Sequence, residues 1–222
     1  MASAQFWGLL RPRRVWLPTL RGWLLLLIPS IALLVFGLRN LAAFLTIDDP
    51  APAGVLVVEG WSPDYALETA ITELKRHPYQ KLYVIGGPLD QGAPLSEYKT
   101  YAELGAATLL RMGVSADTVQ AIPNAYVHKD RTYTAAVALK DWLRRHHAIP
   151  EKLNLLSVGA HARRSRLLFE KAFGGGTQVG IIAVKDRSFD QNHWWKSSQG
   201  FRSVTDEMIA YCYARLFFFR TG

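Results

Sequence analysis

The chain carries two different hydrophobic patterns. Residues 22–38 contain no charged side chain, and after Arg39 the apolar sequence continues to residue 47. From Val55 onward, short apolar runs alternate with longer segments whose apolar residues recur every three or four positions. Because roughly 20 apolar residues cross a bilayer as a helix, the first pattern predicts one transmembrane helix over residues 22–47. The second pattern predicts a folded α/β domain over residues 55–222.

Within the second region, five apolar runs have the length of buried strands, and helical periodicity separates them. Strands that alternate with helices form right-handed crossovers, which makes their sheet parallel and covers both of its faces. The expected fold class is therefore α/β, with three layers and about five parallel strands, preceded by one N-terminal transmembrane helix. The central neighbours are expected to be residues 55–59 and 153–158. The expected strands are 55–60, 81–87, 119–123, 153–158 and 179–184, and the expected helices are 63–77, 97–112 (with Ser96 as its N-cap), 130–147, 162–173 and about 201–219.

Charge sets the expected topology. The formal net charge is +8, and residues 1–47 hold five arginines and no acid, which leaves 8 − 5 = +3 for the rest. Because most of these arginines precede the apolar stretch and Asp48 and Asp49 follow it, the positive-inside rule places the N-terminus in the cytoplasm and the domain outside it, at the plasma membrane. Residues 1–21 then form a basic cytoplasmic N-terminus and residues 48–54 a stiff linker. A cleaved signal peptide is a lesser alternative, because the apolar run is long for one.

Composition narrows the possible partners. The basic excess is largely N-terminal, and the rest of the chain shows no nucleic-acid-binding motif, so we expect no nucleic-acid partner. The single cysteine, Cys212, allows neither an internal disulfide nor a zinc-binding cysteine cluster. We expect no metal site, and the sequence identifies no cofactor.

In parallel sheets, ligands bind beyond the carboxyl ends of the strands. The residues after the first two expected strands are therefore candidates. Glu59 could be a base or an acceptor for a ligand hydroxyl, or equally a carboxylate that caps the next helix. Gly60 suits a tight turn, and Trp61 is typical of packing. Gly86 and Gly87 let a backbone approach a ligand, although no further glycine or lysine completes a nucleotide-binding motif. Glu97 is expected in the first turn of its helix, where the helix dipole stabilises a carboxylate with or without a ligand.

The later strands add further candidates. Asp130 is expected to be the N-cap of its helix, with Arg131 beside it, and helical periodicity aims Thr132 at the end of the sheet. His161 follows the fourth strand. Arg164 falls near the buried side of the first helical turn, where a cation opposes the helix dipole. We therefore expect an anion next to Arg164, either a structural carboxylate such as Glu59 or a ligand phosphate, whereas Arg163 and Arg166 are expected on the solvated face.

These residues resemble the YdcF-like family, which includes the ElyC- and SanA-like envelope proteins. The resemblance covers Val55 to about Phe219. It rests on the strand followed by His-x-x-Arg in VGAHARRSRLLFEKAFG, the strand with two glycines at 84–87, and matches at Glu97 and Thr132. The chain departs from the family in its Glu59-Gly60-Trp61 turn and in lacking the asparagine that often follows the threonine.

The resemblance implies a Rossmann-like fold and, for membrane-anchored members, a role in cell-envelope or peptidoglycan biogenesis, but no reaction. We expect a membrane-anchored envelope protein that handles a phosphate-bearing or lipid-linked ligand. One alternative is a non-catalytic envelope binding module, with Trp194, Trp195 and residues 215–220 as its contact surface. Another, which the flanking charges disfavour, is a cytoplasmic Rossmann-like enzyme for a nucleotide-type ligand. The candidate catalytic residues are Glu59 and His161, and the candidate ligand-binding residues are Gly60, Trp61, Gly86, Gly87, Glu97, Asp130, Arg131, Thr132 and Arg164.

Overall fold

The computed structural model describes residues 17–52 and 54–218, and the chain divides into two units at Arg39 and Asn40. The described part of the first unit contains one helix, α1 (Leu20–Arg39). Its length and apolar composition are sufficient to cross a membrane, and none of its residues is buried. Pro29 lies inside α1, and the Ser30 hydroxyl donates to the Leu26 carbonyl at 2.7 Å.

The apolar stretch expected over 22–47 does not form one continuous helix. After Arg39, a separate short helix, α2 (Leu41–Leu45), belongs to the second unit. Ala42 and Leu45 are buried in a cluster with Val204 and Trp194. The end of the apolar stretch is thus hydrophobic because it supplies part of the domain core.

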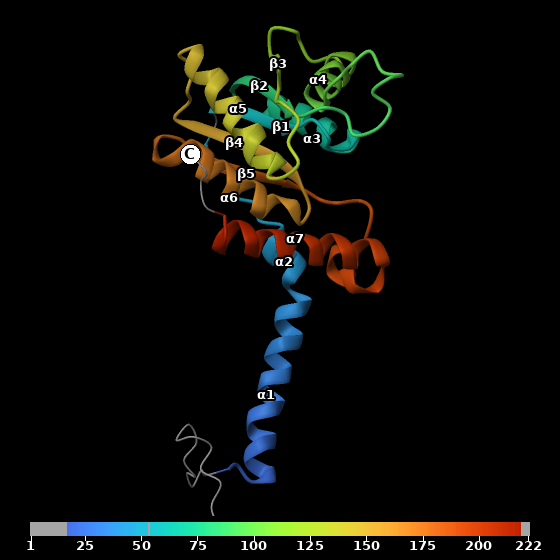
Figure 1. Ribbon diagram of the computed structural model, residues 1–222, viewed down its shortest axis with the longest axis vertical. Coiled ribbons are helices and arrows are strands. Elements are labelled where there is room, and N and C mark those ends of the chain that lie inside the picture. Colours follow the sequence, from blue (N-terminus) through green and yellow to red (C-terminus); the bar gives the residue numbers. More distant parts are fainter. Residues whose placement is uncertain (1–16, 53, 219–222) are drawn as a thin grey trace, which may run out of the picture. The chain divides into compact units, whose positions relative to one another are not determined.

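The second unit contains a five-stranded, all-parallel sheet in the order β3-β2-β1-β4-β5, which confirms the predicted α/β class (Figure 1). β1 and β4 are central neighbours, as predicted, and Val55 lies opposite Leu153. The strand order reverses between these two strands. The chain first adds β2 and β3 on one side of β1 and then crosses over to add β4 and β5 on the other side. The strands are β1 (Gly54–Glu59), β2 (Tyr79–Gly86), β3 (Val119–Pro123), β4 (Lys152–Val158) and β5 (Gln178–Val184).

Helices cover both faces of the sheet and produce two separate cores. In β1, Val55 and Val57 pack in the cluster that contains residues of α5 (Arg131–Arg145) and α6 (His161–Phe173). The alternate residues Leu56 and Val58 pack in the cluster with α3 (Asp64–Arg76) and α4 (Tyr101–Arg111). Alternation along a strand sends successive side chains to opposite faces, so strands buried on both faces are apolar at every position.

The last helix, α7 (Ser198–Leu216), lies against α6 and α2. It begins three residues earlier than expected, because the Ser197 hydroxyl accepts a hydrogen bond from the Gly200 amide at 3.0 Å and caps it. Two short 3-10 segments complete the described chain, η1 (Gly174–Gly176) and η2 (Gln191–Lys196).

The prediction of a helix beginning at Glu97 under a Ser96 cap is wrong. α4 begins at Tyr101, and Thr100 is its N-cap. The Thr100 hydroxyl accepts from the Glu103 amide at 3.2 Å, and the Glu103 carboxylate accepts from the Thr100 amide at 3.0 Å. This Thr-x-x-Glu capping box satisfies two helix-end amides at once, which a lone serine cannot do.

The expected linker 48–54 is attached to the sheet. Asp49 and Ile181 exchange backbone hydrogen bonds of 2.9 and 3.0 Å in an antiparallel bridge. The buried side chain of Asn154 donates to the Ala51 carbonyl at 2.8 Å and accepts from its amide at 2.7 Å. These bonds satisfy a polar side chain inside the core and hold residues 49–51 in place.

Gly60 is required for packing of α4 on the sheet. A Cβ at this position would lie 2.2 Å from the Tyr101 carbonyl oxygen, and one at Gly86 would lie 2.7 Å from the Tyr101 Cβ. We predict that Gly60→Ala lowers the free energy of unfolding by at least about 1–3 kcal/mol, because the neighbour is backbone and cannot move aside. Gly175→Ala is the matched control, since a Cβ there meets no atom within 4 Å. Thermal melts of the full chain in detergent that shift equally for the two variants would contradict this prediction.

Candidate functional site

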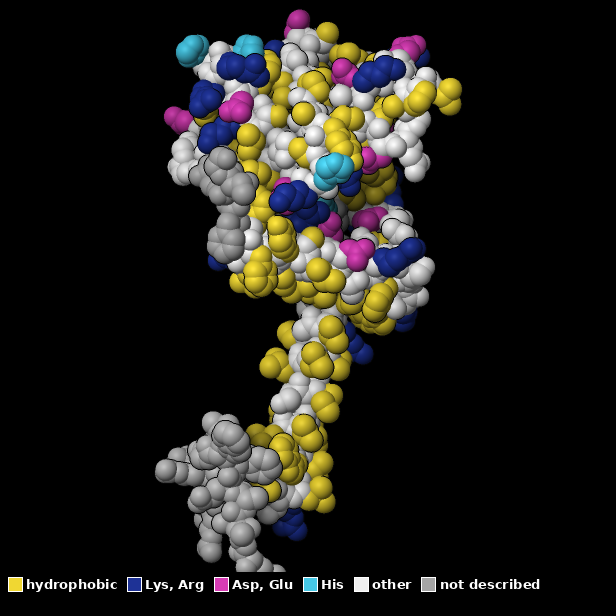
Figure 2. Space-filling view, in the orientation of Figure 1, with side chains coloured by type: hydrophobic (Ala, Val, Ile, Leu, Met, Phe, Trp, Pro, Cys, Tyr) yellow, Lys and Arg dark blue, Asp and Glu magenta, His cyan; other side chains and the backbone are white. Residues whose placement is uncertain are grey.

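A cavity of about 460 Å³ lies beyond the carboxyl ends of β1, β2 and β3. Helices α5 and α6 contribute their N-terminal ends, and α7 closes another side with Ala210, Tyr213 and Ala214. Figure 2 shows charged and histidine side chains around a hollow in this domain. The other lining residues are Trp61, Gly87, Pro88, Asp90, Tyr101, Asn124, Ala125, Tyr126, Val127, His128, Lys129, Asp130, Arg131, Thr132, His161, Arg164, Leu168 and Phe218.

The structure brings seven of the candidate residues to this cavity: Trp61, Gly87, Asp130, Arg131, Thr132, His161 and Arg164. Thr132 is buried, on the helix face that periodicity predicted. Glu59 lies beneath the cavity, 1% exposed. Gly60 and Gly86 do not line it, since what approaches them closely is the start of α4. Glu97 lies on the exposed loop before α4 and does not line the cavity.

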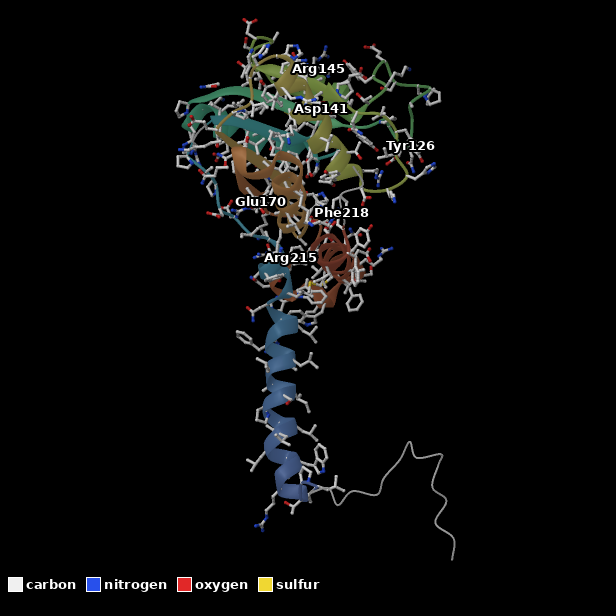
Figure 3. All side chains as sticks on the ribbon, turned by 60° about the vertical axis from the view of Figure 1, so that its left-hand side comes forward. Tyr126, Asp141, Arg145, Glu170, Arg215 and Phe218 are labelled. Carbon is white, nitrogen blue, oxygen red and sulfur yellow. The ribbon has the colours of Figure 1, made fainter. Side chains whose placement is uncertain are left out.

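The loop between β3 and α5 forms the largest part of the lining, from Asn124 to Asp130. At its end, the Arg131 guanidinium donates to the Asp90 carboxylate at 2.9 Å, with both side chains exposed. Figure 3 shows Tyr126 on this loop and Phe218 after α7, and both residues line the cavity. Of these loop residues only Asp130 was a predicted ligand-binding residue, because the others form no recognised motif.

Glu59 is satisfied by three side chains at the junction of β1, β4 and α6. Its carboxylate accepts hydrogen bonds from the Ser157 hydroxyl at 2.8 Å and the Ser165 hydroxyl at 2.9 Å. The Nε2 atom of His161 lies 3.2 Å from the same carboxylate, in an ion-pair contact whose angle is poor for a hydrogen bond. Glu59 is therefore neither free nor a cap of the following helix.

His161 and Arg164 both meet Glu207, which projects from α7. The His161 Nδ1 atom lies 2.9 Å from Glu207 Oε1. Arg164 donates to both Glu207 oxygens, from Nε at 2.8 Å and from Nη2 at 2.9 Å. A bidentate arginine–carboxylate pair fixes direction as well as distance. Sequence reasoning predicted an anion beside Arg164 but not this one, because Glu207 is 43 residues away along the chain.

These contacts shift the ionisation of the pair. Burial disfavours the charged form of His161, but the charge of Glu59 and the contact with Glu207 outweigh it and raise the pKa of His161 to about 9. Burial acts to raise the pKa of Glu207, but Arg164 and His161 overcome it and lower that pKa to about 2. We call Glu59, His161, Arg164 and Glu207 the buried charge cluster. In this cluster each acidic side chain lies against a basic one, so the charged groups are paired within the protein.

The other two arginines of α6 differ from each other. Arg166 pairs with Glu170, four residues further along α6, at 2.9 Å, and also with Asp49 at 2.7 Å. Arg163 was expected on a solvated face, but its guanidinium stacks 4.0 Å from the centre of the Phe44 ring and donates to the Phe44 carbonyl. Arg163 thereby attaches α2 to α6.

Two helix N-termini at the cavity lack side-chain caps. Asp130 is the N-cap residue of α5, as predicted, but its backbone is left-handed (φ 57°) and its carboxylate makes no capping hydrogen bond within the described chain. Ala160 at the N-cap of α6 has no side chain that could cap. Free amides at a helix N-terminus attract anions. Within residues 17–52 and 54–218, no group of three or more His, Cys, Asp or Glu side chains is placed to hold a metal ion.

Comparison of the chain with protein-family models, with curated proteins and with solved structures finds no match to any of them. The features that bear on function are therefore the cavity, the apolar helix and the motif resemblance noted in the sequence.

The cluster makes a prediction about stability. Arg164→Ala should lower the free energy of unfolding by roughly 3–5 kcal/mol, because it removes one partner of a buried ion pair. Arg166→Ala, on the same helix, should cost about 0–1 kcal/mol because its pairs are more exposed. Chemical denaturation of the full chain in detergent measures both. Arg164→Ala with wild-type stability would show that the cluster does not hold α7 to α6.

The cluster also predicts a pH dependence. The pKa of His161 is raised from 6.5 to about 9, so its contribution to stability is complete below pH 6.5 and is lost as the pH rises through about 9. Thermal melts should show His161→Gln less stable than wild type at pH 7.5, by on the order of 2 kcal/mol, with the two curves converging near pH 10. A constant difference across this range would mean that His161 does not become charged on folding.

Proposed function

We propose that the chain is a single-pass membrane protein whose Rossmann-like domain binds a phosphate-bearing or lipid-linked ligand in cell-envelope biogenesis. The strand order and the cavity beyond the strand ends support the fold part of this proposal, because ligands of such sheets bind where the strand order reverses. The resemblance to the YdcF-like family supports the envelope part. Helix α1, with arginines before it and Asp48 and Asp49 after it, supports an anchor with the domain outside the cytoplasm.

The observation that carries the choice of ligand is the pair of uncapped helix N-termini, of α5 and α6, at one cavity. Helix dipoles and free amides favour a phosphate at such a position. Lys129 and Arg131 line the same cavity and add two basic side chains at the start of α5. Arg164 contributes less than its position suggested, because Glu207 already occupies its Nε and Nη2 atoms.

The ring nitrogens of His161 favour a second candidate function, a non-catalytic envelope module that binds its ligand and regulates assembly. Nδ1 is directed at Glu207 and Nε2 at Glu59. A general base needs a nitrogen within hydrogen-bond reach of the proton it removes from the substrate. In this arrangement His161 would first have to leave one of its carboxylates. The proposal of Glu59 and His161 as catalytic residues therefore requires a rearrangement that binding alone does not.

Two observations weaken a third candidate, a cytoplasmic Rossmann-like enzyme for a nucleotide-type ligand. Of the five arginines in residues 1–47, three precede α1 and Arg21 lies in its first turn, whereas Arg39 alone lies at its far end. This distribution favours a domain outside the cytoplasm, where nucleotide cofactors are scarce. Gly86 and Gly87 contribute to α4 packing and to a contact with Asn124 rather than to a completed phosphate loop.

The ligand proposal predicts a preference for phosphate. The full chain in detergent should bind a polyprenyl phosphate at least about tenfold more tightly than the polyprenol that lacks the phosphate. The double variant Lys129→Ala/Arg131→Ala should lose about tenfold or more for the phosphate only, because a hydrogen bond to a charged group contributes roughly 1.5–3 kcal/mol. Titration calorimetry measures both preferences.

The matched control is Arg144→Ala/Arg145→Ala, which removes two exposed basic side chains from the other end of α5. It should bind like the wild type. Equal affinity for the phosphate and the alcohol would refute the ligand class, and an equal loss in both double variants would show that general charge, not this cavity, attracts the ligand.

A further inference from the structure

The described domain leaves several large apolar side chains of α7 uncovered. On α7 and directly after it, Ile209, Leu216, Phe217 and Phe201 are 69%, 63%, 62% and 52% exposed. Ile209, Tyr213 and Leu216 follow one another at helical spacing, so they share one face of α7. Large exposed apolar patches of this kind mark binding surfaces. We call these five residues the α7 outer face.

The α7 outer face cannot turn inward, because the opposite side of the helix is fixed. Val204 and Ala214 are buried against the domain. Glu207 holds α7 to α6 through the ion pairs with His161 and Arg164. A small rotation of α7 therefore cannot bury the exposed side chains in the core, and they remain a surface of the domain.

The position of α2 indicates what covers this surface. α2 packs against α7 through an edge-to-face contact of Phe44 and Tyr211, with ring centres 5.7 Å apart, and through the cluster of Ala42, Leu45 and Val204. Only Asn40 separates the first residue of α2 from the last residue of α1. A helix of 20 residues is about 30 Å long, the thickness of a bilayer's hydrocarbon core. If α1 spans the bilayer, the chain leaves the membrane directly at the element that packs on α7.

The composition around the α7 outer face matches a lipid interface. Aromatic side chains and arginines are enriched where a protein meets the headgroup region. Trp195 is partly exposed near the start of α7, and Arg202 and Arg215 are exposed along it, whereas Asp206 is the acidic side chain exposed on α7. Figure 2 shows hydrophobic side chains, with Lys and Arg among them, along the end of the domain that carries α2 and α7.

From these observations we infer that the α7 outer face is a membrane-contact surface, which lies in the headgroup region of the bilayer that α1 spans. The inference rests on the proposed membrane span. It also joins the bilayer to the cavity, because Tyr213 belongs to the α7 outer face and lines the cavity, and Phe218 lines it close by. The headgroup of a lipid-linked ligand can then enter the cavity while its chain stays in the membrane.

The test measures the depth of α7 in lipid. In a Cys212→Ser background, Ile209→Cys is labelled with an environment-sensitive fluorophore, and the full chain is reconstituted into phospholipid vesicles that contain headgroup-region nitroxide lipids. The matched control is Leu110→Cys, an exposed leucine on α4. We expect a blue-shifted emission at position 209 and at least about twofold stronger nitroxide quenching than at position 110.

Equal, weak quenching at both positions would overturn the inference. A blue-shifted but unquenched probe at position 209, whose shift disappears when the protein is diluted in lipid, would overturn it in favour of a second copy of the chain as the partner. Alkaline extraction of the same vesicles tests the membrane span of α1 separately from the membrane contact of α7. Release of the chain from the vesicles would refute the span itself, whereas retention with an unquenched probe would refute only the membrane contact of α7.

Discussion

The buried charge cluster holds β1, α6 and α7 together at the point where the strand order of the sheet reverses. Glu59 ends β1, His161 and Arg164 begin α6 after β4, and Glu207 comes from the middle of α7. Each of these side chains would be costly to bury alone, since an isolated charge loses its hydration, but their pairing and the two serine hydroxyls on Glu59 offset this cost. The position of α7 therefore depends on α6. Because α7 forms one wall of the cavity and carries the α7 outer face, the position of both depends on the same cluster.

The same cluster changes how the site is understood. A histidine and an arginine at a helix start suggest an anion site, but here the anion is a side chain of the protein. If the cavity binds a phosphate as proposed, the contacts come from the starts of α5 and α6 and from the neighbouring Lys129 and Arg131. A protein of this kind can recognise a charged headgroup with a rigid scaffold behind it, whether or not a chemical step follows.

Periodicity predicted the sheet and the helix faces well. Thr132, Ala136, Leu139 and Leu143 are buried on one side of α5, and Ser165, Leu168 and Ala172 on one side of α6, because burial of one helical stripe is a local consequence of sequence spacing. Helix starts were less predictable. The Ser96 cap was wrong, and Asp130 is the N-cap residue of α5 without a capping hydrogen bond from its side chain, since capping depends on which side chain reaches the amides. The Thr100–Glu103 pair was a readable signal that the prediction overlooked. Glu207 and the loop residues 124–129 could not be predicted, because their role arises only from contacts between distant segments.

The single residue between α1 and α2 has a mechanical consequence. A residue extends by at most about 3.6 Å, so Asn40 cannot act as a long, freely swinging tether. Residues 49–51 are fastened to the sheet as well, which removes the slack that the Pro- and Ala-containing segment would otherwise provide. If α1 spans a membrane as proposed, so short an attachment limits how far the domain can move from the surface. Its rate of finding a membrane-bound ligand would then follow lateral diffusion and the surface density of that ligand rather than a bulk concentration.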